Sequence, residues 1–352
     1  MKKLLIALSM SPLFASAGLF ELTCVSGNGL GACGAQGQTI LNEVAAEINK
    51  NLPSASSKDE YFSGMSTANA MSAAGVTSSY GTVFERFLVG ITASGGAHLG
   101  SKNFTDFGDL SDNPEQFRGF GAQAAIVFGA NVGRLFGSEG GAFDLSKLNV
   151  YLSGFALNKK FGDVDTDYMG MGIGAQYRLM DGTNFTRLIR WTGLDVGAGL
   201  LYSKLKLDAL INLNKTYTVT SGGNTYNAPF TGNADFDANV STIMLPLEVS
   251  SAIRFFYFLK FVAGLGVDIN MGKTDASGRL TNSSLTADAG GGNDVTGTAT
   301  FDINGSGSPK VANARVFFGP HFEFGVGSIF VNVHKSLIEN AVAVNTGLNF
   351  FW

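Results

Sequence analysis

In a series of segments between residue 80 and Trp352, apolar side chains recur at every second position. Met169, Met171 and Ile173 alternate with glycines, and Leu265, Val267 and the neighbouring apolar positions alternate with small or polar residues in the same way. A period of two places all of the apolar side chains of an extended segment on one face. The pattern therefore predicts strands that each have one apolar face and one small or polar face.

The alternating segments are longer than the strands of soluble β proteins. A soluble strand averages about 5–6 residues, whereas a tilted strand that crosses the hydrocarbon of a membrane needs about 9–11. Ten segments follow the pattern, at residues 83–99, 117–133, 145–159, 167–180, 188–213, 237–254, 258–275, 309–324, 329–336 and 341–352. A hairpin hidden around Val295–Ile303 widens the range to eight to twelve strands. We predict an all-β fold, an antiparallel transmembrane β-barrel of about ten strands.

The connections between these segments alternate in length. Long polar stretches at residues 100–116, 214–236 and 276–308 follow odd-numbered segments, and short turns such as 254–257 and 325–328 follow even-numbered ones. Long loops on one rim and short turns on the other are typical of outer-membrane barrels, whose short turns are periplasmic. The pattern predicts that the long loops are extracellular.

The first 17 residues have the three parts of a signal peptide. Lys2 and Lys3 supply a positive start, residues 4–14 form an apolar run, and residues 15–17 read Ala-Ser-Ala, a small-residue cleavage site. The apolar run is too short to span a bilayer, which needs about 20 residues. We expect the mature chain to begin at Gly18 and to be exported.

Residues 18–79 contain the helical periodicity of the chain. Apolar residues recur at three- and four-residue spacing between Thr39 and Leu52, Thr39 can cap the start, and Pro53 stops the continuation. A weaker Ala- and Met-rich helix is expected over Asp59–Ala74. We predict a short helical segment that either plugs the barrel or caps its periplasmic mouth, followed by the barrel at residues 80–352.

Composition narrows the class of protein. The chain is 45% hydrophobic and 15% charged, with a net charge of −4 that becomes −6 when Lys2 and Lys3 are removed with the leader. An acidic chain argues against nucleic acid as a partner. The most apolar later stretch, residues 253–267, is interrupted by Arg254 and Lys260, so a transmembrane helix is not expected there.

Cys24 and Cys33 are the only cysteines. Both lie in the exported part, where an oxidising compartment favours pairing, and the residues between them are rich in glycine. We predict a disulfide. Neither a His nor a further Cys lies nearby in the sequence, so a metal site is not expected, and no cofactor fingerprint is found.

Charged side chains fall on the predicted inner face, since a charge that faces lipid costs about 2–4 kcal/mol near the bilayer centre. These lumen-lining candidates are Arg86, Lys147, Arg178, Asp195, Glu248, Arg254, Lys260, Asp268, Arg315, Glu323 and His334. They form either a structural ion-pair network or a charge-lined path for solutes. Inward glycines at 170, 172, 174, 197, 199, 264 and 266 leave space in the lumen, and the helix at Thr39–Leu52 is the expected occupant.

The last strand, residues 341–352, resembles the C-terminal insertion signal of bacterial outer-membrane β-barrels. In that superfamily an aromatic residue ends the chain and apolar residues precede it at alternate positions, as Val344, Leu348, Phe350 and Trp352 do here. The resemblance implies a location in the bacterial outer membrane. It also implies outer-membrane lipids and the barrel-assembly machinery as partners.

A second resemblance concerns chemistry. His334-Lys335-Ser336 is similar to the His-x-Ser core of outer-membrane lipid hydrolases, in which the imidazole deprotonates the hydroxyl. Those families continue with Asn, whereas Leu337 stands here. Glu323 or Glu339 would orient the imidazole in such a site.

The leading functional prediction is a passive, cofactor-free, porin-like channel for small solutes. The N-terminal segment is the candidate gate of this channel. The alternatives are a surface-exposed structural or adhesion barrel without transport and, third, a lipid hydrolase. The oligomeric state is left open by the sequence.

Overall fold

The computed structural model describes residues 21–27, 33, 35–50, 58–74, 76, 84, 86–100, 118–137, 144–221, 224–288, 294–300 and 302–352. The expected signal peptide and all but the first residue of the expected loop 100–116 lie outside these ranges.

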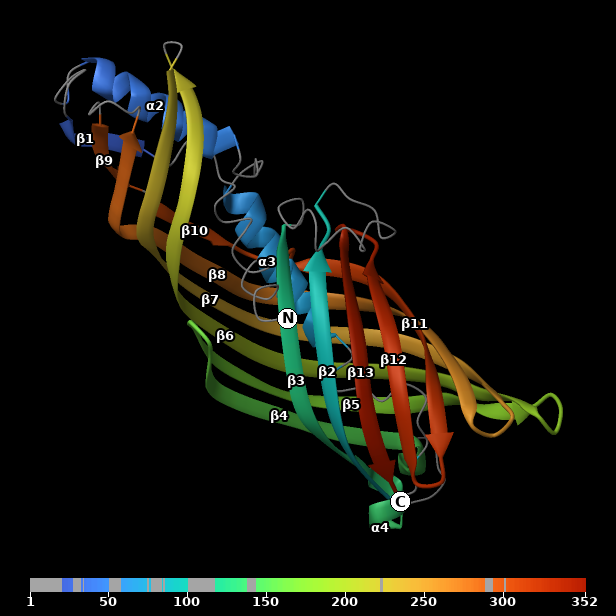
Figure 1. Ribbon diagram of the computed structural model, residues 1–352. Helices are drawn as coiled ribbons and strands as arrows, with labels where there is room; N and C mark the ends of the chain where they lie inside the picture. The colour runs from blue at the N-terminus through green and yellow to red at the C-terminus, as the bar shows by residue number, and fades with distance from the viewer. Residues whose placement is uncertain are drawn as a thin grey trace.

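Within the described residues, ten antiparallel strands close into a ring (Figure 1). In ring order they are β2 (Phe87–His98), β3 (Gly119–Asn131), β4 (Leu148–Phe161), β5 (Val164–Asn184), β6 (Ile189–Ser221), β7 (Asn224–Phe255), β8 (Leu259–Asp288), β11 (Ala312–Phe324), β12 (Gly327–Ser336) and β13 (Ala341–Phe351). β13 pairs with β2, and β7 pairs with β8, which completes the circle. The predicted barrel and its strand number are confirmed.

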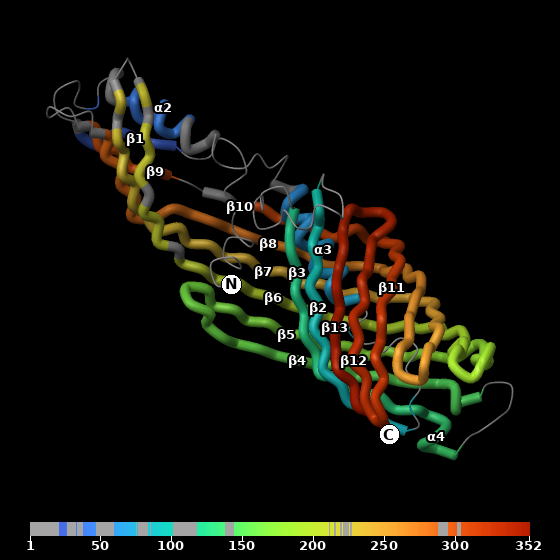
Figure 2. The backbone as a smooth tube through the Cα atoms, turned by 45° about the vertical axis from the view of Figure 1, so that its right-hand side comes forward, coloured from blue at the N-terminus to red at the C-terminus, as the bar shows by residue number. Residues whose placement is uncertain are grey.

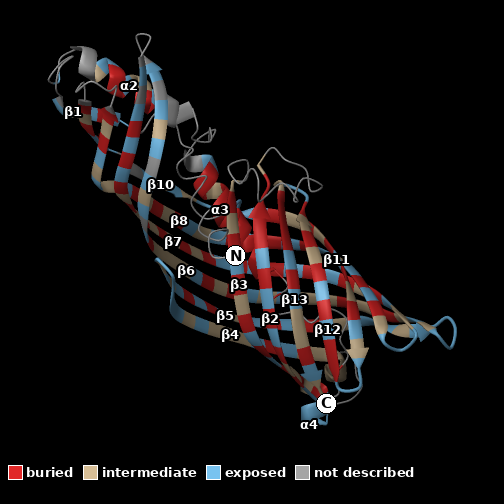
Figure 3. Cartoon of the chain, viewed as in Figure 1, coloured by how far each residue is buried: buried red, intermediate tan, exposed pale blue. Residues whose placement is uncertain are grey.

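Burial alternates along these strands, as Figure 3 shows in bands of colour. In β5 the side chains of Met169, Met171 and Ile173 are exposed on the outside, while Gly170 and Gly174 are buried on the inside. The two-residue period of the sequence therefore distinguishes the outer face from the lumen.

The two rims of the barrel differ. At the rim that carries the C-terminus, β2 begins beside the end of β13, where the backbone N–H of Arg86 donates to the carbonyl of Trp352 at 2.8 Å. The connection from β3 to β4 on this rim contains α4 (Val132–Phe136) and the 3-10 turn η3 (Leu145–Lys147). We call this the C-terminal rim and the opposite one the head rim.

Beyond the head rim, β6, β7 and β8 continue as a long ribbon (Figures 1 and 2). β9 (Asp294–Thr300) pairs with the end of β8, and β1 (Glu21–Gly27) pairs with β9. β10 (Asp302–Gly307) pairs with β8 nearer the ring. The prediction of long loops at 214–236 and 276–308 was wrong for most of both ranges. The residues suspected of forming a hairpin, Val295–Ile303, lie in β9 and β10, but both strands pair with β8 and not with each other.

The ribbon was mistaken for loop because its exposed face is polar and its buried face mixes small residues, such as Ala228 and Ala234, with larger apolar ones, such as Phe230. Threonines such as Thr216, Thr218 and Thr220 fit strands through their β-branched side chains despite their polarity. One face of the ribbon is buried and the other is exposed and largely polar, so the row of exposed apolar side chains on the ring strands does not continue there.

The end of the ribbon has its own core. α2 (Ala35–Lys50) packs on β1, β6 and β9, and Leu41, Val44, Phe230 and Leu285 are buried between these elements. We call β1, α2, β9 and residues 210–236 and 276–288 the head. The buried cluster continues to the mouth of the barrel at Phe62.

In the described part of the chain before the ring strands there are two helices, as predicted. α2 begins at Ala35, four residues before the expected cap at Thr39, and α3 spans Lys58–Ala73. No helix among the described residues is long and apolar enough to cross a membrane.

Candidate functional site

The lumen of the barrel is occupied by α3, which lies behind β2 and β3 in Figure 1. The helix approaches the wall closely at two inward glycines. A Cβ on Gly96 would lie 2.3 Å from the carbonyl oxygen of Ala68, and one on Gly121 would lie 2.4 Å from the Cα of Asn69. Some of the glycines on the inner face thus make room for a helix backbone.

Polar side chains join α3 to the opposite wall. The Asn69 amide donates to the hydroxyls of Ser203 at 3.1 Å and Thr242 at 3.0 Å. The hydroxyls of Ser66 and Thr274 lie 2.6 Å apart. These side chains are fully or almost fully buried, and a buried polar group without a partner would cost about 1–3 kcal/mol, so the bonds fix the helix in one position.

The expected plug, the helix at Thr39–Leu52, lies elsewhere. This is a correction: α2 packs in the head, and α3 holds the place that was assigned to it. Sequence reasoning passed over α3 because the helix has no apolar stripe. Its residues are mostly small and polar, such as Ser66, Asn69 and Ser72, which suits a helix that is surrounded by polar lumen side chains.

Beyond the C-terminal end of α3, two described residues lie inside the barrel. Val76 and Phe84 are buried in one cluster with Leu88, Val127 and Tyr151 of the inner wall. The hydroxyl of Thr92 donates to the Val76 carbonyl at 3.4 Å. Val76 and Phe84 therefore pack against the inner wall formed by β2, β3 and β4.

A charged network fills the other half, at the C-terminal end of α3. Arg315 is completely buried, and its Nε lies 2.9 Å from a carboxylate oxygen of Asp268 while its Nη2 bonds Glu248. Its Nη1 lies 2.9 Å from Nδ1 of His334, whose Nε2 contacts Asn345. Four of the predicted lumen residues thus form one cluster.

This network is tied to the helix. The Asn345 amide donates to the carbonyl of Ala74, and the amide of Asn313 contacts the sulfur of Met71 at 3.1 Å and Asp268 at 3.4 Å. We call Glu248, Asp268, Arg315, His334 and Asn345 the floor network, since they lie where α3 ends.

The remaining predicted lumen residues form separate pairs or lie at the rim. Arg178 and Asp195 form a two-bonded pair at 2.9 and 3.1 Å. Lys260 is 2.6 Å from Glu323, and Arg254 is 3.7 Å from the same carboxylate. Lys147 bonds Asp181 at 2.6 Å from η3. Arg86 is exposed in the bend before β2, so it does not line the lumen.

The other inward glycines have two roles. Gly264 and Gly266 make room for side chains of β11, since a Cβ there would lie 2.3 Å from the Phe317 ring and 3.0 Å from Cζ of Arg315. Gly174, Gly197 and Gly199 line a cavity with Tyr151, Gln176, Pro246, Glu248 and Ser250. The cavity measures about 20 Å³, which is room for about one water molecule.

The His-x-Ser pair is engaged in structural contacts. Both ring nitrogens of His334 contact floor-network residues. The Ser336 hydroxyl donates to Asn313 and accepts the backbone N–H groups of Ile338 and Glu339 at 3.2 and 2.9 Å. Ser336 thus caps the turn to β13, and the geometry gives no support to a hydrolase in which His334 activates it.

The residues of the expected insertion signal lie on the outer face at the end of β13. Val344, Phe350 and Trp352 are exposed, and Leu348 is half-buried. Phe87 packs against Trp352 with ring centroids 6.1 Å apart.

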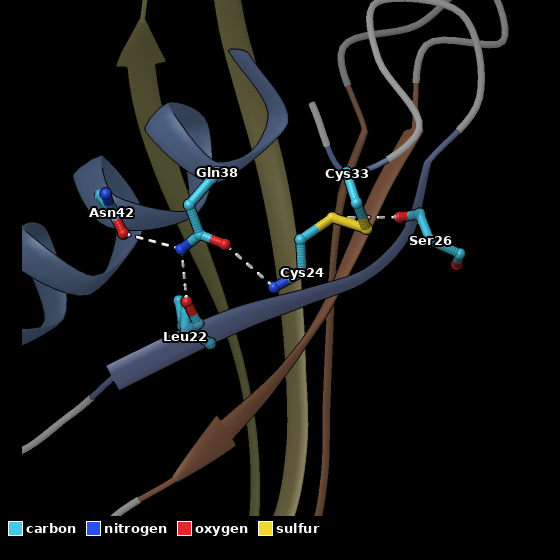
Figure 4. Close-up of a disulfide and its surroundings, with 6 residues drawn as sticks. All are labelled: Leu22, Cys24, Ser26, Cys33, Gln38 and Asn42. Carbon is cyan, nitrogen blue, oxygen red and sulfur yellow. Dashed lines mark hydrogen bonds between the residues drawn. A yellow bond between two sulfur atoms is a disulfide. The ribbon is translucent and has the colours of Figure 1, made fainter. Parts of the chain in front are cut away.

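The predicted disulfide joins Cys24 of β1 to Cys33, with Cα atoms 5.4 Å apart (Figure 4). Beside it, the Gln38 side chain ties α2 to β1. It donates to the Leu22 carbonyl at 2.7 Å and accepts from the Cys24 N–H at 3.2 Å. The disulfide therefore fixes the chain just before α2 in the head.

The fold and site together define a closed antiparallel β-barrel with a helix inside its lumen. The chain belongs to the Lsa36-like family, which matches residues 21–352. None of the curated proteins compared matches the sequence.

Several solved structures are similar in fold. The CymD monoaromatic hydrocarbon channel is 8% identical, covering 77% of this chain and 90% of its own, with a TM-score of 0.23. The translocator domain of autotransporter NalP from Neisseria meningitidis is 8% identical, covering 77% and 89%, with a TM-score of 0.26. LpxR from Salmonella typhimurium is 10% identical, covering 74% and 100%, with a TM-score of 0.21. None of them assigns a role to a residue of this chain.

Proposed function

We propose that this protein is a bacterial outer-membrane barrel with a closed lumen, and that it serves to hold the head at the cell surface. The observation that carries the proposal is the placement of α3. The helix contacts β2, β3, β6, β7, β8, β11 and β13 of the ring, and the floor network lies at its end. A barrel filled in this way is an anchor, and the exposed functional part is the head.

A belt of apolar side chains supports the membrane location. On β8 the outward residues from Phe261 to Met271 are apolar and mostly exposed, and the next outward residue is Lys273. Ten residue steps cover about 33 Å of strand, which at a tilt of about 40° matches an apolar band about 25 Å tall. Apolar patches of this size mark membrane or protein contact surfaces.

The belt ends in one row across the sheet. Lys204, Ser241 and Lys273 are cross-strand neighbours directly beyond it. At the other edge, exposed aromatic residues gather at the C-terminal rim, namely Phe256, Tyr257, Phe258, Phe324 and Trp352. Aromatic girdles of this kind lie at the headgroup level.

The orientation follows from the unequal rims. The turns at the C-terminal rim are mostly short, as periplasmic turns are, and the ribbon and head extend from the other side. We place the head outside the cell. The final strand then serves, as its resemblance implies, as the signal read by the barrel-assembly machinery, and outer-membrane lipids surround the belt.

Labelling of intact cells tests this proposal. Thr225 lies exposed near the ribbon tip, and Val326 lies 64% exposed in the turn between β11 and β12 at the C-terminal rim. A membrane-impermeant maleimide should label Thr225→Cys on intact cells and Val326→Cys only after the outer membrane is permeabilised. Both native cysteines are paired and do not react. The reverse pattern would contradict the proposed orientation.

The second candidate is a gated channel for small solutes. The water-sized cavity beside Gly174, Gly197 and Gly199 favours it, since it leaves part of the inner wall without packing. The bonds that hold α3 are hydrogen bonds between small polar groups, and water could replace them if the helix moved. Such a channel would conduct only after displacement of α3.

A further inference from the structure

The two ends of α3 lead to opposite rims of the barrel. Before α3, β1 and α2 lie in the head, where β1 pairs with β9 over Glu21–Gly27. After α3, Val76 and Phe84 lie inside the barrel, and β2 begins at Phe87 beside Trp352 on the C-terminal rim. The described residues before and after α3 therefore lie on opposite sides of the barrel, with α3, Val76 and Phe84 in the lumen between them.

The helix is enclosed by the ring. Its contacts reach β2 and β3 at Gly96 and Gly121, and β6 and β7 through Asn69. They reach β8 through the bond between Ser66 and Thr274. Met71 contacts Asn313 of β11, and Asn345 of β13 donates to the Ala74 carbonyl. A chain held in this way cannot leave sideways without opening the strand pairs.

We propose that the barrel exports its own N-terminal segment: residues 21–50 reach the outer side through the lumen, and α3 is the part of the chain that remains there. The inference rests on the orientation proposed above. If the leader directs the chain to the periplasm, where the C-terminal rim lies, residues 21–50 start on the wrong side for their final position. The lumen is the route from the periplasmic side to the outer side that the structure provides.

The sequence of α3 fits this passage. From Ser63 to Ala73 its residues are small or polar apart from Met65 and Met71, so the helix is narrow and makes no large apolar contact that would stop it midway. The disulfide closes a short loop, with a sequence separation of 9, which adds little width to an exported segment.

The head supplies a reason for the direction of movement. Leu22, Leu41 and Val44 become buried against β9, β7 and β8 only after they reach the far side. Burial of apolar surface is favourable, and pairing of β1 with β9 satisfies backbone groups at that edge. Folding of the head outside would therefore retain the segment there.

The first test locates the segment. Ala46 is an exposed residue of α2, and Ala46→Cys should react with impermeant maleimide on intact cells as fast as Thr225→Cys. If Thr225→Cys reacts and Ala46→Cys does not, the inference is wrong while the proposed orientation of the barrel stands. If Val326→Cys reacts on intact cells and Thr225→Cys does not, the proposed orientation itself has failed.

The second test concerns the route. A small domain that becomes locked by its own disulfides in the periplasm is fused before residue 21, with a cysteine-free copy as the matched control. We expect the locked domain to reduce labelling of Ala46→Cys at least tenfold while Thr225→Cys, which reports an assembled barrel, is labelled as before. The cysteine-free copy should restore labelling of Ala46→Cys. Equal labelling with both fusions would overturn passage through the lumen.

Discussion

At the scale of single residues, the floor network is the feature that depends most on the exact placement of hydrogen-bond and charge partners. Arg315 is surrounded by two carboxylates and an imidazole, with side-chain exposures of 0% for Arg315 and 1% for Asp268. Charges this deep need partners with good geometry, because desolvation alone opposes their burial. Arg315 supplies donors to both carboxylates at once, so it holds β7, β8 and β12 to one another through the lumen.

Replacement of this guanidinium should destabilise the barrel strongly. Arg315→Met leaves Glu248 and Asp268 buried without their cation, a change that costs about 3–5 kcal/mol. The control is Arg279→Met, which removes a surface pair with Asp235 in the ribbon and should cost less than about 1 kcal/mol. Urea unfolding of protein refolded in detergent or lipid measures both. Equal midpoints for the two variants would show that the network does not stabilise the fold.

Sequence alone identified which charged residues face inward, but it could not assign their partners. A period of two gives the face of each strand, whereas the partner depends on register. Arg315 stands opposite Gly266, and Asp268 stands opposite Asn313 two pairs further along, on the same face. The same reasoning placed Arg86 and Lys147 inside, because nothing in the pattern marks where a strand ends at the rim.

At the scale of elements, α3 occupies the lumen position that the sequence suggested for α2, and α2 packs in the head instead. An apolar stripe indicates an amphipathic helix that covers a hydrophobic core, and α2 does so in the head. A helix inside a polar lumen needs small and polar residues all round, and this pattern resembles a weak helix when it is read alone. The environment of a helix in a barrel is set by the strands that follow it, so local sequence could not reveal it.

A substitution of one inward glycine tests the position of α3. Gly121→Ala places a Cβ 2.4 Å from the Asn69 backbone, which forces the helix or strand to shift and costs about 1–3 kcal/mol by overpacking. Gly95→Ala is the matched control, because its Cβ meets nothing within 4 Å, and its effect should stay within about 0.5 kcal/mol. Thermal unfolding compares them. A neutral Gly121→Ala would place α3 outside the lumen.

The ribbon has a pH-sensitive pair outside the membrane belt. Asp208 and Asp237 are cross-strand neighbours in β6 and β7. Their mutual hydrogen bond, with Lys206 second, lowers the pKa of Asp208, while the same bond raises the pKa of Asp237. The Asp237 contribution to stability is present below its ordinary pKa and is lost as pH rises through the raised one. The Asp208 contribution is present above its ordinary pKa and is lost as pH falls through the lowered one.

We therefore expect the ribbon to be most stable in acid, between the two shifted pKa values, and to loosen as pH rises above the upper one. Asp237→Asn replaces the shared proton by an amide donor, so it should remove the loosening at higher pH. Hydrogen exchange of residues 204–240, corrected for the intrinsic effect of pH, measures this. If hydrogen exchange in Asp237→Asn speeds up with rising pH as much as in the native chain, the carboxyl pair is not the cause of the loosening.

At the scale of the whole molecule, the barrel was predictable and the head was not. Ten long alternating segments predict a ring because each requires lipid on one side and a lumen on the other, and the lengths of the connections give its two rims. The head, unlike the barrel, is not specified by one repeated pattern along the chain. Its core is assembled from β1, α2, β9 and the ribbon, which are distant in sequence, and none of them carries a continuous pattern that predicts the others.

The most direct test of the account is electrical conductance in planar lipid bilayers. The full chain should insert without measurable single-channel steps, because α3, Val76, Phe84 and the floor network fill the lumen. A variant that lacks residues 20–78 but keeps the signal peptide and barrel should conduct, with steps at least several-fold larger than any from the full chain. Thermal unfolding of the variant confirms that the barrel is folded. If the full chain conducts as well as the variant does, the lumen is open, and the view of this protein as a closed anchor for its head is wrong.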